Sequence, residues 1–440
     1  MDVAFVTLGC AKNEVDTDKM RARVQGAGYS IAEDALDARL VVVNTCSFLV
    51  SAAEESLDTI FDLIDAQAAS PRKGKLLVAG CMPARYGSDL ENELVEAAGF
   101  LDASEEERIV DAVASIIGPP EFEMPGHVSA YETLRSDVGT SAYVKISDGC
   151  NRFCTYCMIP YIRGRYHSFS MDDILDEVGE LVGKGAGEIV FIGQDTGIWG
   201  HDLGDGQNLE ALLRTAATSY PQTWFRVLYL QPSGITDGLL DLVDSMPNIC
   251  PYFDIPLQHA NADVLARMNR SGSPSEYLQL VRRIRERVRD VTVRTTLMAG
   301  FPQETPEQFE ELMNFVDDAE FDYAVVFPYS QETGSAAAAF EHQVDEDEKL
   351  LRAQRLLDAC ENIGFRRAAA HVGEVLDVLV EGYEETDVGM EAVGRWMGQA
   401  PEVDGQIHIR AYNGHLPDIG TKVHARITES FCYDLEGELV

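Results

Sequence analysis

KISDGCNRFCTYC, residues 145–157, places Cys150, Cys154 and Cys157 in one short segment, with three and then two residues between them. The segment continues an apolar run that we expect to be a strand. Thiolates are the usual ligands of iron–sulfur clusters, and this spacing can direct three sulfurs to three corners of a cubane cluster. The fourth iron is then open to another ligand. Zinc is the rival interpretation, but it usually draws on two cysteine or histidine pairs, and no second pair lies nearby. Three buried, inert thiols are the plainest alternative.

The spacing, with Tyr156 just before the last cysteine, resembles the defining loop of the radical S-adenosylmethionine superfamily. The resemblance implies that Cys150, Cys154 and Cys157 are the catalytic cluster ligands and that Tyr156 lies at the cofactor. It also implies that the open iron binds S-adenosylmethionine and passes an electron to it, releasing methionine and a 5′-deoxyadenosyl radical.

In residues 1–125, strand-like runs alternate with helical stretches at 15–26 and 52–69, which predicts a parallel sheet covered by helices. The strand-like runs are 3–8, 40–44 and 75–79. Each is followed at once by a cysteine: Cys10, Cys46 and Cys81. Because parallel strands end at one edge of a sheet, we expect these thiols to lie together as a second three-cysteine cluster site. Cysteines that merely end buried strands are the alternative.

The segments around these cysteines, LGCAKN (8–13), VNTCSF (43–48) and VAGC (78–81), resemble the N-terminal domain of the methylthiotransferases. The resemblance implies that Cys10, Cys46 and Cys81 hold a 4Fe-4S cluster that presents a methylated sulfur for insertion. Ala11 and Glu14 depart from the common pattern, but neither is a ligand position. Residues 119–137 contain several prolines and little periodicity, which indicates a linker.

Residues 138–370 hold six strand-like runs, with helical segments that include 171–182, 209–219, 275–288 and 306–319. The runs are 143–147, 188–192, 225–230, 252–255, 291–297 and 323–327. The alternation predicts a partial (β/α)6 barrel with its reactive groups at the carboxyl ends of the strands. Gln194, Asp195 and Gly300 follow such strands, and together they resemble cofactor-binding positions of the radical S-adenosylmethionine enzymes. His259 could act in catalysis, although a structural, hydrogen-bonded histidine is the preferred interpretation.

Residues 372–440 contain short alternating runs separated by turn residues, which predict a small antiparallel β-barrel of the OB-like kind. Position and sequence resemble the TRAM domain that closes methylthiotransferases. The segment 394–405 resembles the corresponding segment of the methylthiotransferase branch that acts on a ribosomal protein. Trp396 and Met397 depart from the more polar residues that are typical of that branch. With 14 acidic and 4 basic residues, a net charge of −10, this barrel is poorly suited to RNA phosphates.

The whole chain is also acidic, with 74 Asp and Glu against 35 Lys and Arg, a formal net charge of −39. Such a surface repels nucleic acids and attracts basic partners, although adaptation to a salty cytoplasm would produce the same balance. Nine cysteines and no recognisable export signal favour a reducing, cytoplasmic setting. No apolar run reaches membrane-spanning length, so we expect no membrane association.

Together the resemblances imply an α/β radical enzyme with two 4Fe-4S clusters and S-adenosylmethionine, which methylthiolates the β-carbon of an aspartate in the twelfth small-subunit ribosomal protein. Its partners would be that basic protein, an electron donor such as flavodoxin or ferredoxin, and a sulfur source. We do not expect direct nucleic-acid binding. Two alternatives stay open: methylthiolation of adenosine in transfer RNA, and a non-enzymatic iron–sulfur electron-transfer protein.

Overall fold

The structure is a computed structural model that describes residues 2–70, 73–120, 138–204, 206–386, 389–411 and 415–440. Most of the expected linker, residues 121–137, lies outside the described residues. The chain forms two compact units. The first contains residues 1–137, 147–180 and 332–335, and the second contains 138–146, 181–331 and 336–440. The three domain ranges expected from the sequence stay a prediction.

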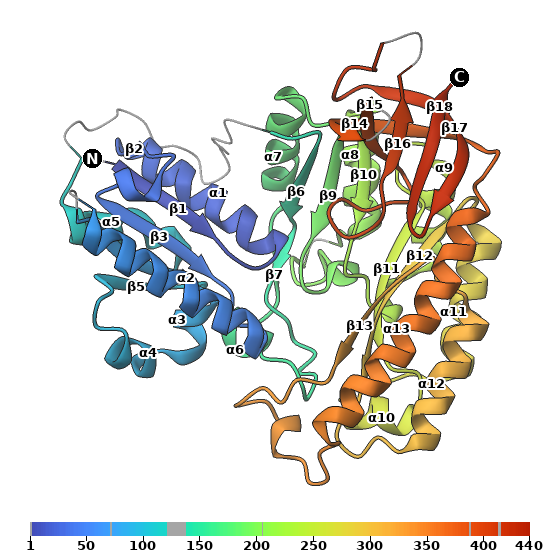
Figure 1. The fold of residues 1–440 in the computed structure, drawn as a ribbon, viewed down its shortest axis with the longest axis horizontal. Helices are drawn as coiled ribbons and strands as arrows, with labels where there is room; N and C mark the ends of the chain where they lie inside the picture. The colour runs from blue at the N-terminus through green and yellow to red at the C-terminus, as the bar shows by residue number, and fades with distance from the viewer. Residues whose placement is uncertain (1, 71–72, 121–137, 205, 387–388, 412–414) are drawn as a thin grey trace. The chain divides into compact units, whose positions relative to one another are not determined.

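The first unit is built on a five-stranded sheet with the order β2-β1-β3-β4-β5, in which every neighbouring pair is parallel (Figure 1). Its strands are β1 (Asp2–Thr7), β2 (Ser30–Ile31), β3 (Leu40–Thr45), β4 (Lys75–Gly80) and β5 (Gly99–Asp102). The sheet confirms the parallel architecture predicted from the sequence. The short strands β2 and β5 were not predicted, because they lack a long apolar run.

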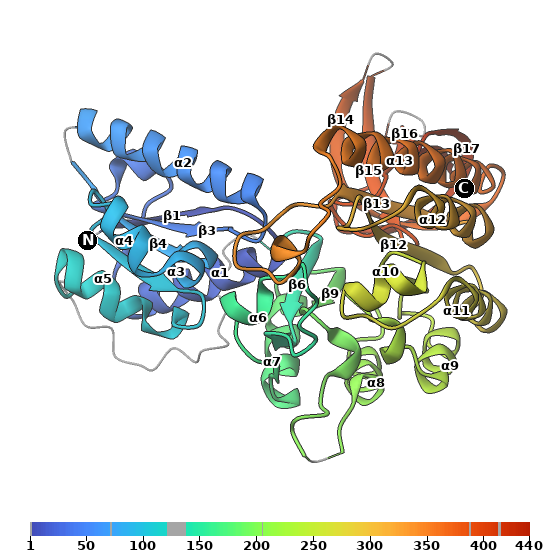
Figure 2. The same cartoon turned by 90° about the horizontal axis from the view of Figure 1, so that it is seen from below.

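Helices cover both faces of this sheet, as Figure 2 shows for α2 and α5. They are α1 (Ala11–Gly26), α2 (Val50–Ala69), α3 (Cys81–Tyr86), α4 (Ser88–Glu93) and α5 (Ile109–Ile117). Met20 of α1 and Val113 of α5 pack in one core cluster with Val42 of β3. Ile60 of α2 packs with Val41 and the rest of the opposite face. Strand β3 is therefore buried on both sides, which explains its unbroken apolar sequence.

The cysteine segment 150–157 belongs to this first unit. It leaves a short antiparallel ladder between β7 (Ser147–Asp148) and β8 (His167–Ser168) and leads into the single turn of α6 (Ile159–Ile162).

The second unit contains the six strands predicted for the partial barrel, arranged as two three-stranded parallel sheets, β10-β9-β6 and β11-β12-β13. The strands are β6 (Ser141–Lys145), β9 (Glu188–Ile192), β10 (Trp224–Val227), β11 (Tyr252–Gln258), β12 (Thr292–Ala299) and β13 (Tyr323–Pro328). A backbone hydrogen bond from Leu230 to Asp254, 2.9 Å long, links the two sheets beside β10 and β11.

Helices alternate with these strands, as the βα pattern requires. They are α7 (Met171–Gly183), which begins in the first unit, α8 (Leu209–Ser219), α9 (Asp237–Ser245), α10 (Ala262–Arg267), α11 (Pro274–Arg287), α12 (Pro306–Ala319) and α13 (Glu346–Ala369). In the described part of the chain, no helix combines the length and apolar character needed to cross a membrane.

A closed barrel with the order β14-β15-β16-β18-β17 completes the second unit (Figure 1). Its strands are β14 (Val375–Thr386), β15 (Gly389–Trp396), β16 (Ile407–Arg410), β17 (Lys422–Phe431) and β18 (Asp434–Leu439). All neighbouring pairs are antiparallel, as predicted, except β16 and β18, which run parallel. The barrel interior is filled by apolar side chains that include Val378, Ile407 and Leu435.

Candidate functional site

Cys10, Cys46 and Cys81 follow three adjacent strands, β1, β3 and β4, at their carboxyl ends. Two glycines with positive φ bring the loops close together. Gly9 (φ +100°) lies so near Cys46 that a Cβ atom on Gly9 would stand 2.6 Å from the Cys46 Cβ. Gly80 (φ +91°) would similarly place a Cβ atom 2.1 Å from the Asn44 side-chain oxygen. Only glycine fits at these two positions, so the chain is shaped to bring the cysteine loops together.

Asn13 ties these loops to one another. Its amide Nδ2 donates hydrogen bonds to the carbonyl oxygens of Leu8, at 2.8 Å, and Thr45, at 3.0 Å. Its Oδ1 lies 3.9 Å from the Cys81 Sγ. A single fully buried side chain therefore contacts all three cysteine-bearing strand ends. Apart from its place in the LGCAKN segment, nothing in the sequence marks Asn13 as a residue of this site.

The donor set fits an iron–sulfur cluster. Burial raises the pKa of the Cys81 thiol to about 12, with Cys46 and Cys10 adding to the rise and Arg163 opposing it. The three thiols therefore lie within one another's electrostatic fields, and ligation by a metal would have to displace their protons. Among the described residues, no group of three or more His, Cys, Asp or Glu side chains is arranged to hold a metal ion. A cubane has its irons at separate corners, so it needs thiolates spaced more widely than the ligands of one ion.

Cys150, Cys154 and Cys157 are all half-buried in the first unit. The Cys150 amide donates to the Gly164 carbonyl at 3.2 Å, and the Cys157 amide donates to the Cys154 carbonyl at 3.0 Å. Gly149 (φ +74°) precedes them where a Cβ atom would stand 2.3 Å from the Arg165 carbonyl oxygen. The loop is therefore held by its own backbone, with three soft donors on one turn, and this donor set also fits a cubane cluster.

Aromatic and cationic side chains brace the same loop. Phe153 has a positive φ of 49°, and its ring packs edge-on against Tyr161 with centroids 6.2 Å apart. The Arg165 guanidinium lies 4.5 Å from the centre of the Phe153 ring. Tyr156, the residue expected at the cofactor, is half-buried in this loop, and its role stays a prediction.

Arg163 is a buried cation that sequence reasoning missed. Its Nη1 donates to Asp16 Oδ2 at 2.8 Å and to Asp148 Oδ2 at 3.2 Å. Burial lowers the pKa of the guanidinium, but the carboxylates of Asp16 and Asp148 outweigh this and hold it well above its ordinary value. Arg163 is therefore a permanent positive charge beside the cysteine loops.

In the second unit, Gln194 and Asp195 follow β9, and Gly300 follows β12, as expected from the sequence. The backbone amide of Gly300 (φ +76°) donates a hydrogen bond to Glu304 Oε2 at 2.9 Å. Arg352 donates to Glu304 Oε1 at 2.8 Å. Glu304, which the sequence did not single out, thus shapes the turn after β12. The cofactor roles of Gln194, Asp195 and Gly300 stay predictions.

His259 is fully buried at the end of β11. Its Nδ1 accepts a hydrogen bond from the Asn261 amide at 3.0 Å, and its Nε2 lies 3.5 Å from Glu304 Oε2. One ring nitrogen is hydrogen-bonded within the protein, and the structural role preferred from the sequence stays a prediction.

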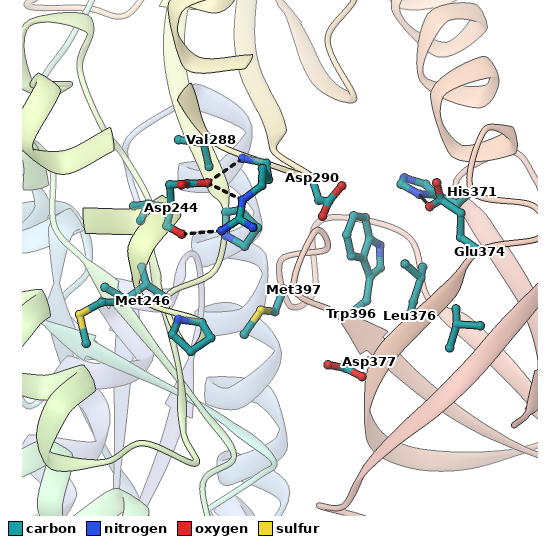
Figure 3. Close-up of a pocket in the computed structure, with 16 residues that line it drawn as sticks. Asp244, Met246, Val288, Asp290, His371, Glu374, Leu376, Asp377, Trp396 and Met397 are labelled. Atoms are coloured by element: carbon teal, nitrogen blue, oxygen red, sulfur yellow. Dashed lines mark hydrogen bonds and ion pairs between the residues drawn. The ribbon is translucent and has the colours of Figure 1, made fainter. Parts of the chain in front are cut away.

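A cavity of about 660 Å³ lies elsewhere in the second unit (Figure 3). Pro251 and Asp290, which line it, stand just before β11 and β12, and Leu376, Trp396 and Met397 line its barrel side. These are the amino ends of the strands, whereas the expected cofactor positions follow their carboxyl ends. The cavity is therefore not the cleft in which the predicted reaction would occur.

Comparison with protein families divides the chain into three matched regions. Residues 2–102 match "Uncharacterized protein family UPF0004", residues 144–316 match the radical SAM superfamily, and residues 372–440 match the TRAM domain.

Curated relatives match the chain from end to end. "Ribosomal protein uS12 methylthiotransferase RimO" of Geobacter sulfurreducens is 40% identical over 448 residues, which cover 100% of this chain and 98% of the relative. The protein of the same name from Symbiobacterium thermophilum is 40% identical, covering 99% of this chain and 90% of the relative.

Solved structures share the fold at low sequence identity. A radical S-adenosylmethionine methyltransferase, TsrM, from Kitasatospora setae, solved with tryptophan substrate and a SAM analogue, has a TM-score of 0.52 and 14% identity, covering 86% of this chain and 78% of that one. The cobalamin-dependent radical enzyme OxsB also has a TM-score of 0.52, with 12% identity, covering 82% of this chain and 56% of that one.

Proposed function

The chain belongs to the ribosomal protein uS12 methylthiotransferase (RimO) family, and from this membership we propose that it attaches a methylthio group to the β-carbon of an aspartate in protein uS12. The observation that carries the proposal is full-length identity of about 40% to the RimO proteins, in a chain with two separate three-cysteine sets. Methylthiolation of transfer RNA fits less well, because the barrel of residues 372–440 carries a net charge of −10.

The radical SAM family implies one 4Fe-4S cluster and S-adenosylmethionine. We assign that cluster to Cys150, Cys154 and Cys157, and a second cluster to Cys10, Cys46 and Cys81. The second assignment is supported by the glycine cradle at Gly9 and Gly80 and by the mutual influence of the three thiols. When bound, these groups supply the one-electron cleavage of an unactivated carbon–hydrogen bond and the methylthio group that replaces the hydrogen.

The protein's own residues would bind the two clusters and S-adenosylmethionine and orient them. Asn13 and the two glycines hold Cys10, Cys46 and Cys81 at one sheet edge, while Gly149 and the Phe153–Arg165 contact keep the second cysteine loop in its turn. Tyr156, Gln194, Asp195 and Gly300 would contact S-adenosylmethionine. Because the Gly300 amide already donates to Glu304, Gly300 would contribute the shape of its turn rather than its N–H group.

The remaining partners follow from charge and chemistry. The acidic surface suits a basic ribosomal protein. An electron donor such as flavodoxin or ferredoxin and a source of sulfur would complete the reaction. All nine cysteines lie among the described residues as free thiols, which suits a reducing cytoplasm.

Product analysis tests the function. The reconstituted protein would be incubated with S-adenosylmethionine, a reductant and sulfide, with either protein uS12 or unmodified transfer RNA as substrate. Mass spectrometry should find a methylthio group on an aspartate of uS12, and none with the Cys150→Ala, Cys154→Ala, Cys157→Ala variant as enzyme. Methylthio-adenosine in the RNA would support the alternative enzyme. If the protein has its full iron content and forms neither product, both activities are contradicted.

A further inference from the structure

The Arg163 guanidinium touches both cysteine-bearing regions of the first unit. Its Nη2 donates to Asn13 Oδ1 at 2.7 Å and lies 3.9 Å from the Cys81 Sγ. Its Nη1 reaches Asp16 and Asp148, and the side chain is only 3% exposed. The residue lies six positions after Cys157 in the sequence, yet its head group stands beside the strand-end cysteines.

Neutralising the buried Asp16 does not by itself explain this arrangement. One guanidinium nitrogen, Nη1, serves the two carboxylates, and the other, Nη2, is directed at Asn13 and at the Cys81 sulfur. Asn13 is the side chain that binds the loops of Cys10 and Cys46. The Nη2 group of Arg163 therefore contacts Asn13, which holds the cysteine loops together, and also Cys81, one of the three cysteines.

The contact with Asp148 extends to the other cysteine loop. Asp148 Oδ1 also accepts a hydrogen bond from the Gly149 amide at 2.9 Å, and Gly149 directly precedes Cys150. A continuous chain of contacts thus runs from the Cys81 sulfur through Arg163 and Asp148 to the peptide that positions Cys150.

We propose that Arg163 is a positioning residue for the cluster held by Cys10, Cys46 and Cys81, and that it makes this cluster easier to reduce by donating an N–H group to the Cys81 sulfur. The inference rests on the proposed second cluster. Hydrogen bonds to cluster sulfurs and nearby positive charge stabilise the more negative, reduced state, so they raise the reduction potential. Arginine keeps its charge when buried, which suits it to this task.

The test uses the full-length Cys150→Ala, Cys154→Ala, Cys157→Ala protein, in which only the strand-end cluster can form. Arg163→Met and Arg163→Lys are added to this background. Iron per chain is measured first, and then the midpoint potential by a redox titration followed by electron paramagnetic resonance. Arg108→Met is the matched control, because Arg108 is an arginine of the same unit that forms an exposed ion pair with Glu105.

We expect Arg163→Met to keep its iron and to shift the midpoint to a more negative potential with an altered spectrum. Arg163→Lys should recover part of the shift, and Arg108→Met should leave the midpoint unchanged. A full iron content with an unchanged midpoint in Arg163→Met would overturn the inference. Absence of iron in the parent triple variant would instead contradict the second cluster itself.

Loss of iron in Arg163→Met is also informative. Retention of iron in Arg163→Lys would then support a positioning role that needs a cationic donor. If both variants lose iron, the Arg163→Met, Asp16→Asn protein decides, because it also removes the buried carboxylate charge that Arg163→Met leaves without its partner. Recovery of full iron with an unchanged midpoint would assign Arg163 to charge pairing alone and overturn the inference, whereas a persistent loss of iron supports the contact with the cysteine site.

Discussion

Arg395 of β15 donates a hydrogen bond from Nη2 to Oε2 of Glu188 in β9 at 2.6 Å, although 207 positions separate them in the sequence. The other Glu188 oxygen, Oε1, accepts from the Arg226 Nε at 2.7 Å. The Glu188 side chain is fully buried, and that of Arg395 is 2% exposed. The barrel is thus joined to strand β9 by a buried ionic contact, and breaking it would leave one buried oxygen of the Glu188 carboxylate without its partner.

Arg395→Met should destabilise the second unit by about 3–5 kcal/mol, because it leaves Glu188 and Glu381 short of a buried partner. Urea unfolding followed by circular dichroism at neutral pH would measure the loss. Arg289→Met is the control, since Arg289 is an exposed arginine of the same unit paired with Asp244, and it should cost less than about 1 kcal/mol. Equal losses in the two variants would contradict a special role for the buried pair.

The same contact predicts an acid dependence of stability. Burial raises the pKa of Glu188, but Arg226 and Arg395 outweigh it and lower this pKa to about 2, from 4.5 in the unfolded chain. The stabilisation is therefore complete above pH 4.5 and is lost as the pH falls through the folded value. In Glu188→Gln, unfolding midpoints at pH 7 should already be reduced, and the decline from pH 5 to pH 3 should be shallower than in the wild type. Parallel pH curves would refute this assignment.

Two separate clusters predict a definite iron content. The reconstituted wild type should bind about eight irons, and changing Cys150, Cys154 and Cys157 together to alanine should leave about half. The Cys10→Ala, Cys46→Ala, Cys81→Ala variant should likewise keep half, and changing the buried Cys250 and Cys360 to alanine should remove none. Colorimetric iron determination provides the measurement. Loss of all iron from either triple variant would show that the two sites are not independent.

The two cysteine sets should also differ in chemistry. Without Cys150, Cys154 and Cys157, the protein should form no 5′-deoxyadenosine from S-adenosylmethionine. Without Cys10, Cys46 and Cys81, it should still form 5′-deoxyadenosine but transfer no sulfur to uS12. Chromatography of the nucleoside products and mass spectrometry of uS12 give the two readings, and normal methylthiolation by the second variant would remove the sulfur-delivery role.

Acidic side chains on the barrel should speed the association of a basic substrate. Glu384, Glu385, Glu429 and Glu438 are exposed, and changing all four to glutamine should slow binding of uS12 several-fold at low salt, with less effect at high salt. Each exposed ion pair between a barrel glutamate and uS12 contributes roughly 1 kcal/mol or less, so a measurable change in the association rate requires all four substitutions together. The sequence alone also suggests Glu381 and Asp387 as members of this acidic set. However, Glu381 is paired with Arg395, and Asp387 lies outside the described residues.

Stopped-flow binding across a salt series measures this effect. The matched control neutralises four exposed acids of α2, Glu54, Asp58, Asp62 and Asp65, and should change the rate less. An association rate that changes neither with salt nor with the barrel substitutions would mean that the acids form only a solvated, salt-tolerant surface.

The sequence by itself determined the sheet of the first unit and the six strands of the second, because these strands are long apolar runs bounded by turns. It also located both cysteine sets, since one lies in a local motif and the members of the other each follow a strand. Parallel pairing of β1, β3 and β4 then brings Cys10, Cys46 and Cys81 to one edge without further information.

Only the tertiary structure revealed the groups that surround those cysteines. Arg163 and Asp16 are 147 positions apart, and nothing periodic in the sequence marks either residue as buried or as a partner of the other. The same holds for Glu188 with Arg395, and for the parallel pairing of β16 with β18. Hydrophobic periodicity reports which face of an element is buried, whereas the pairing of buried charges depends on which elements meet in space, and that is decided only when the chain has folded.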